Sequence, residues 1–95
     1  MENILERYKN LPLGNICDAN GKRGCMNQDI RPIDPTLHMS GYAFTVRCHP
    51  GDNLAIHKAI LEAPKDSVLV VDAGGYTNGG HIGEIMCFAC MQKGI

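Results

Sequence analysis

The last third of the chain joins an aliphatic run to a glycine-rich loop, and together they could bind an anion. The run is "SVLVV", and Asp72 and five glycines follow it, the last of which, Gly83, begins the next helix. Apolar spacing predicts that helix over about Gly83–Lys93. Backbone N–H groups in a first helical turn have no intrahelical partner, and the helix dipole adds about 0.3–1 kcal/mol for a negative charge. We therefore predict that a carboxylate or phosphate binds to the first turn, which consists of Gly83, Glu84, Ile85 and Met86.

The glycine loop also has a plainer interpretation, which is a permissive turn between a strand and a helix. Each of its glycines can adopt a positive φ and lets other groups approach its backbone closely; these are Gly74, Gly75, Gly79, Gly80 and Gly83. The segment "GGYTNGGHIG" lacks both a clean GxGxxG register and the Gly-Lys-Ser/Thr ending of a phosphate loop, which disfavours a nucleotide. His81 could donate to a bound carboxylate, but a solvated loop histidine is favoured. Asp72 could orient or cap the loop. We do not assign it a catalytic role.

The cysteines and histidines are weaker candidates for chemistry. Cys87 and Cys90 form a Cys-x-x-Cys pair, which is compatible with redox chemistry or half of a zinc site. A structural role is favoured because Cys87 lies a turn inside the predicted helix and Cys90 falls on its core face. The odd count of five cysteines favours reduced thiols over a disulfide framework. The four histidines show neither His-x-x-x-His nor Glu-x-x-His spacing, so no preformed metal site is indicated.

Three further elements must position the glycine loop. Residues Gly41–Cys48 are rich in β-branched and aromatic side chains and predict a strand. A helix follows over "NLAIHKAILEA", with Asp52 placed to accept hydrogen bonds from its first N–H groups and Pro64 at its end. The unbroken run Ser67–Val71 is typical of a strand covered on both faces, as in parallel sheets. The order strand, helix, strand predicts a βαβ unit.

Helical spacing also predicts which side chains are buried. The middle helix would bury Ala55, Ile56, Ala59, Ile60 and Ala63. The last helix would bury Ile82, Met86, Ala89 and Cys90. Gly94 is placed to end this last helix. Near the N-terminus, Ile4–Asn10 predicts a short helix, and the turn-rich segments Asn20–Gly24 and Arg31–Thr36 follow it.

Length and composition predict one soluble α/β domain spanning residues 1–95. The chain is 44% hydrophobic and 20% charged, which is ordinary for a globular protein with one modest core. Its formal charge of -1 and its scattered basic residues argue against nucleic acid as a partner. The N-terminal segment "MENILERYKN" lacks the apolar stretch of a signal peptide or a membrane span. We therefore expect a cytoplasmic protein with no membrane contact.

Five segments in this order and at these separations resemble the RraA-like family. They are "DAN", "GYAFTV", "PGDN", "VLVVDAGG" and "GEIMCFACMQKG", and the resemblance runs from about Ile16 to Ile95. The family contains the regulators of ribonuclease activity A and the class II 4-hydroxy-4-methyl-2-oxoglutarate aldolases. The resemblance implies a three-layer β/β/α, swivelling-domain-like fold assembled as a homotrimer or hexamer. It also implies that the backbone of Gly83, Glu84, Ile85 and Met86 holds the carboxylate of a substrate.

Two departures from the family bear on activity. Members carry a Gly-x-x-Arg-Asp motif, whose arginine contacts the substrate and whose aspartate anchors magnesium or manganese, and these 95 residues do not contain it. The resemblance therefore implies a C-terminally incomplete domain, truncated before its later strands, with neither catalytic residues nor metal ligand of its own. Members also commonly carry alanine, often preceded by arginine, where this chain has Gly79 and Gly80.

The resemblance implies a metal-dependent lyase for a complete member. Such an enzyme would cleave 4-hydroxy-4-methyl-2-oxoglutarate or 4-carboxy-4-hydroxy-2-oxoadipate to pyruvate and a second 2-oxo acid, with oxaloacetate decarboxylation as a related activity. We expect this chain alone to be inactive. The alternative is a non-catalytic regulator that binds a ribonuclease by protein contact, and a third possibility is a degenerate, aggregation-prone fragment. The residues leave open the choice between aldolase and regulator, the substrate and the oligomer size.

Overall fold

The computed structural model describes residues 3–95. Its chain forms two compact units, Met1–Ser40 and Gly41–Ile95, and each is described by itself. The described residues contain four helices and a two-stranded parallel sheet, which makes the protein a small α/β structure. None of these helices is long and apolar enough to cross a membrane. A second β layer and a single domain over residues 1–95 stay predictions.

The N-terminal unit holds two short helices and a long irregular segment. Its helices are α1 (Ile4–Tyr8) and α2 (Leu13–Ala19). The prediction of a helix at Ile4–Asn10 is confirmed, although α1 ends earlier. Asn3 caps its start, since the Asn3 side chain accepts a hydrogen bond from the Leu5 N–H at 3.0 Å. Helix α2 was not predicted, because Gly14 and Asn15 are poor helix formers. No residue among positions 3–40 is buried.

The C-terminal unit is the predicted βαβ unit followed by a helix. Its elements are β1 (Tyr42–Arg47), α3 (Leu54–Glu62), β2 (Ser67–Asp72) and α4 (Glu84–Lys93). Strands β1 and β2 are parallel neighbours, with Tyr42 opposite Ser67 and Arg47 opposite Asp72. Helix α4 ends at Gly94, as predicted, and this glycine adopts the left-handed conformation with φ 75°.

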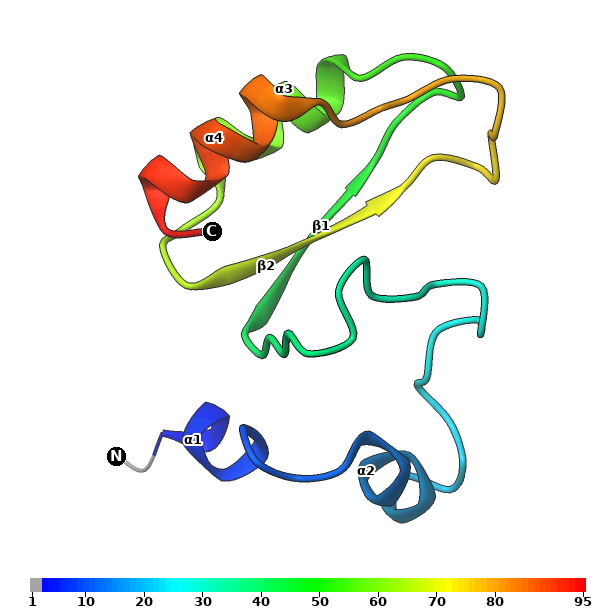
Figure 1. The fold of residues 1–95 in the computed structure, drawn as a ribbon, viewed down its shortest axis with the longest axis vertical. Helices are drawn as coiled ribbons and strands as arrows, with labels where there is room; N and C mark the ends of the chain where they lie inside the picture. The colour runs from blue at the N-terminus through cyan, green and yellow to red at the C-terminus, as the bar shows by residue number, and fades with distance from the viewer. Residues whose placement is uncertain (1–2) are drawn as a thin grey trace. The chain divides into compact units, whose positions relative to one another are not determined.

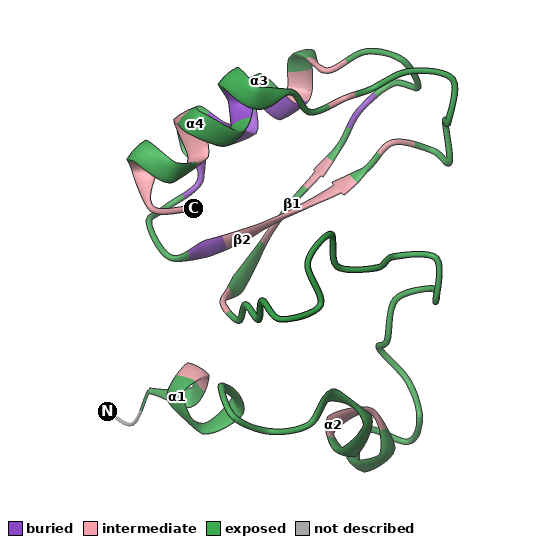
Figure 2. Ribbon diagram, in the orientation of Figure 1, coloured by how far each residue is buried: buried purple, intermediate pink, exposed green. Residues whose placement is uncertain are grey.

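Helices α3 and α4 lie on the same side of the sheet (Figure 1) and enclose the core of this unit. Figure 2 shows the buried residues concentrated where α3 faces the strands. The central cluster is Cys48, Ile56, Ile60 and Met86. Ile56 has no exposed surface, and complete burial of such a side chain contributes about 1.5–3 kcal/mol. The predicted core face of α3 is confirmed, since Ile56, Ala59, Ile60 and Ala63 are buried and Ala55 packs against the cluster.

One prediction about burial is wrong. Ile82 is 50% exposed because α4 begins only at Glu84, so Ile82 belongs to the loop and not to the helical face. Strand β2 is half-buried on both faces. Leu69 and Val71 pack against the core cluster, and Val68 and Val70, which alternate with them, are also half-buried.

Candidate carboxylate-binding site at the start of helix α4

Helix α4 begins at a residue that cannot cap it. Gly83 has an extended backbone, with φ -117° and ψ 179°, and no side chain forms a capping hydrogen bond there. The Cys87 N–H donates to the Gly83 carbonyl at 3.0 Å, so the three preceding amides have no intrahelical acceptor. These amides belong to Glu84, Ile85 and Met86. Their backbone N–H groups have no acceptor within the helix, and anion binding by them stays a prediction.

Helix α3 satisfies its first turn differently. The Asp52 carboxylate accepts a hydrogen bond from the Leu54 N–H at 2.9 Å. This confirms the predicted capping role of Asp52, although Asn53 occupies the cap position itself. A carboxylate from the chain thus binds the start of α3. The capping residue of α4 offers no such group.

Asp72 orients the start of the loop between β2 and α4. One carboxylate oxygen accepts the Gly74 N–H at 2.9 Å, and the other lies 3.3 Å from the Arg47 Nε. The Gly74 amide is the main cause that holds the pKa of Asp72 below its ordinary value; the Arg47 guanidinium also lowers this pKa, and desolvation opposes both. Asp72 therefore orients the loop, one of the two roles considered for it.

Only two loop glycines use their conformational freedom. Gly74 and Gly75 have φ of 69° and 75°, whereas Gly79, Gly80 and Gly83 lie outside the positive region. The positive φ that the sequence permits at all five is adopted at Gly74 and Gly75. A Cβ at Gly80 would meet nothing within 4 Å. Its place in the loop therefore does not require glycine.

His81 is a structural acceptor in the loop. Its Nε2 accepts the Gly51 N–H at 3.0 Å, and its ring packs edge-on against Tyr76 with centroids 5.7 Å apart. An accepting Nε2 is unprotonated, which leaves the proton of a neutral imidazole on Nδ1. The favoured interpretation of a solvated histidine is wrong, because His81 is half-buried and paired. Its Nε2 is also unable to donate to a carboxylate.

Asn53 connects this loop to helix α3. Its Nδ2 donates to the His81 carbonyl at 3.3 Å and lies 3.7 Å from the Met86 Sδ. With the Gly51–His81 bond, this contact fastens the end of the loop and the first turn of α4 to the start of α3. Sequence reasoning missed the anchoring roles of Gly51 and Asn53. The only available signal was their position in the segment "PGDN".

Comparison with known proteins identifies the family of this chain. Residues 13–95 match the family described as RraA-like: Aldolase/RraA. The chain belongs to the RraA-like family. It is 33% identical over 92 residues to a protein of Halalkalibacterium halodurans whose name provisionally assigns it as a 4-hydroxy-4-methyl-2-oxoglutarate aldolase. The match covers 97% of this chain but 44% of that relative, so the chain spans less than half of the relative's length. No solved structure matches this chain.

The RraA-like family implies a divalent cation, and the described residues do not fit one. Residues 3–95 contain no group of three or more histidine, cysteine, aspartate or glutamate side chains placed to hold a metal ion. Asp72, the acidic residue at the end of β2, is already bonded to Gly74 and Arg47. Oxygen ligands of a hard cation would have to come from groups other than these.

The environment of Cys90, in the Cys-x-x-Cys segment of α4, disfavours its thiolate. Cys87 is exposed and Cys90 is half-buried, and both are free thiols. Desolvation raises the pKa of Cys90, with a further increase from the neighbouring Cys87. A raised pKa disfavours the reactive thiolate. This environment supports the structural role predicted for Cys90 in the RraA-like chain.

Proposed function

We propose that this RraA-like chain binds the carboxylate of a small 2-oxo acid at the first turn of α4, as part of a class II aldolase site. The backbone N–H groups of Glu84, Ile85 and Met86 are the donors. The observation that carries the proposal is the uncapped start of this helix at Gly83. The substrate class follows from family membership, since a relative is named for 4-hydroxy-4-methyl-2-oxoglutarate aldolase.

The chemistry of these amides favours a carboxylate over a neutral ligand. Hydrogen bonds to charged groups contribute about 1.5–3 kcal/mol each, and the helix dipole adds about 0.3–1 kcal/mol for an anion. The bond from Leu54 to Asp52 is the same contact made within the chain at α3. A pyruvate carboxylate would make the corresponding contact at α4. The side chain of Glu84 carries the same negative charge and opposes binding to a small degree.

The proposal is limited to substrate binding for these 95 residues. Retro-aldol cleavage breaks a carbon–carbon bond and leaves its electron pair on the pyruvate enolate, whose oxygen must be stabilised. The sequence holds no Gly-x-x-Arg-Asp motif, and the described residues form no metal-ligand group. We therefore propose that the groups that stabilise the enolate lie outside this chain. Binding without turnover is the behaviour that we propose for the chain alone.

The homotrimer or hexamer implied by the family is also a proposal. Helix α4 exposes three large apolar side chains at successive spacings of three residues, so they share one face. These are Ile85, Phe88 and Met91, which are 84%, 60% and 75% exposed. Association between copies of the chain would remove this row from water.

The experiment compares two variants at one position. Glu84→Pro removes the backbone N–H, whereas Glu84→Ala keeps it, and both remove the side-chain carboxylate. Proline is tolerated at the first helical position, and Gly83 already has the extended backbone that a residue before proline needs. We expect calorimetry with pyruvate to show binding by Glu84→Ala at least as tight as by the natural chain. Binding by Glu84→Pro should be about 10–150-fold weaker, from the loss of one charge-assisted bond.

Circular dichroism and thermal melting of both variants control for the fold. Equal pyruvate binding by two folded variants would overturn the proposal, because the missing N–H would then contribute nothing. No binding by the natural chain would also count against it. That second result would favour the regulator that acts by protein contact.

A further inference from the structure

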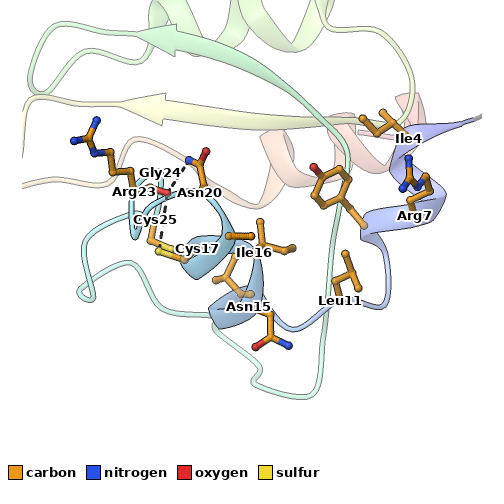
Figure 3. Close-up of a pocket in the computed structure, with 13 residues that line it drawn as sticks. Ile4, Arg7, Leu11, Asn15, Ile16, Cys17, Asn20, Arg23, Gly24 and Cys25 are labelled. Atoms are coloured by element: carbon orange, nitrogen blue, oxygen red, sulfur yellow. Dashed lines mark hydrogen bonds between the residues drawn. The ribbon is translucent and has the colours of Figure 1, made fainter.

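The N-terminal unit contains a pocket of about 780 Å³ (Figure 3). Residues of α1, α2 and the segment after α2 line it. Cys17, on the last turns of α2, and Cys25, in the following segment, both belong to its wall. These two cysteines lie in a different unit from the proposed carboxylate site.

A tight turn after α2 brings the two cysteines together. The Lys22 N–H donates to the Cys17 carbonyl at 2.8 Å, and the Asn20 Nδ2 donates to the Arg23 carbonyl at 3.0 Å. The Cys17 thiol lies 3.9 Å from the same Arg23 carbonyl. Positive φ at Gly21, Lys22 and Gly24 reverses the chain, with values of 70°, 61° and 91°. The residues after the turn therefore return toward α2.

The two thiols face the same pocket. Cys17 and Cys25 both line its wall, and Figure 3 shows their side chains near each other beside the Arg23 carbonyl. Cys25 is exposed and Cys17 is partly exposed, so a small reagent can reach them. The hydrogen bond with Cys17 is the main cause that raises the pKa of Cys25, and Asp18 contributes in the same direction. The protonated thiol is therefore favoured at Cys25, which slows reaction without preventing it.

We propose that Cys17 and Cys25 form a redox-active dithiol that a low-molecular-weight disulfide, such as oxidised glutathione, converts into an intrachain disulfide. The thiolate of one cysteine attacks a sulfur of glutathione disulfide, whose S–S bond breaks to release one glutathione thiolate. The thiolate of the other cysteine then attacks the protein sulfur of the mixed disulfide and releases the second glutathione. Two protein thiols lose two electrons and two protons, and one glutathione disulfide becomes two glutathione thiols.

The disulfide would fix the wall of the pocket. It would close a ring over Cys17–Cys25 and lock the turn that Gly21, Lys22 and Gly24 form. Reduction would release the same turn. The pocket and the dithiol therefore belong to one oxidation-sensitive segment.

The test uses the complete chain in glutathione redox buffers, with alkylation of free thiols and mass spectrometry of the peptides. We expect the Cys17–Cys25 disulfide to exceed every other pairing of the five cysteines by at least about tenfold, because the tight turn holds these two thiols on the same pocket wall. Cys25→Ser should instead leave Cys17 as a mixed disulfide with glutathione. A Cys87→Ser, Cys90→Ser double variant is the matched control and should keep the Cys17–Cys25 bond.

The same reaction in denaturing urea separates folding from mere proximity in sequence. Loop-closure entropy in an unfolded chain favours the shorter loop between Cys87 and Cys90. Preference for Cys17–Cys25 in buffer and its loss in urea would support the proposal. A predominant Cys87–Cys90 bond in buffer, or a persistent mixed disulfide at Cys25 in the natural chain, would overturn it.

Discussion

The ammonium group of Lys93 joins the end of α4 to the end of α3, and Lys93→Met tests how strongly this contact stabilises the C-terminal unit. The Lys93 Nζ donates to the carbonyls of Ile60 and Leu61, both at 2.6 Å. These carbonyls lie in the last turn of α3, where a helix offers no backbone N–H partner. The cation also lies at the negative end of the α3 dipole.

The expected loss is about 2–3 kcal/mol of unfolding free energy. A hydrogen bond from a charged donor contributes about 1.5–3 kcal/mol, and this range applies to the part-buried bond with Ile60. The bond with Leu61 is exposed, so water can replace it and its contribution is smaller. The helix dipole adds about 0.3–1 kcal/mol, and ordering the long lysine side chain opposes these gains by up to about 2 kcal/mol.

Equilibrium unfolding in urea, followed by circular dichroism, measures the loss. Lys58→Met is the matched control, because Lys58 makes a 3.9 Å ion pair with Glu62 between side chains that are 75% and 57% exposed. Such a pair contributes about 0.3–0.5 kcal/mol. A loss in Lys93→Met no larger than that in Lys58→Met would refute the reasoning.

Two further predictions concern the loop before α4. Gly75→Ala should lower the unfolding free energy by about 1–2 kcal/mol, because Gly75 has a φ of 75° that alanine adopts only with strain. Gly80→Ala should raise the unfolding free energy by about 0.4–1 kcal/mol, because position 80 has open space around it and no positive φ. Equal effects of the two variants in urea unfolding would contradict the loop conformation. Asp72 should titrate below its ordinary pKa in carbon NMR, and Arg47→Gln should raise this pKa only slightly, since the Gly74 amide is the main cause. Because the pKa of Asp72 is lower in the folded state, its carboxylate stabilises the protein at pH values above the unfolded-state pKa, and this stabilisation is lost as pH falls through the folded-state pKa. Asp72→Asn should therefore weaken the dependence of stability on acid pH. An Asp72 that titrates at or above its ordinary pKa would contradict this prediction.

Much of the C-terminal unit could be predicted from local pattern. The period of apolar residues predicted α3 and its buried face, and Gly94 correctly marked the end of α4. The aliphatic run predicted a parallel strand, and Val68 to Val71 are half-buried along it. Family membership followed from the order of several short motifs, none of which is specific alone.

The anchors of the candidate site could not be predicted in the same way. Gly51 and His81 are bonded although 30 residues separate them, and Asn53 reaches His81 and Met86 over similar separations. No local pattern encodes such contacts, which depend on how β1, α3 and the loop meet in space. His81 was misinterpreted for this reason. The sequence located the free amides of α4 but not the side chains that hold them in place.

The carboxylate site itself is tested most directly by a proton–nitrogen NMR titration of the natural chain with pyruvate. The account predicts saturable shifts that are largest at the amides of Glu84, Ile85 and Met86, with small shifts at the amide of Leu54, where Asp52 already occupies the start of α3. Saturable shifts centred elsewhere, or none at the first turn of α4, would contradict it.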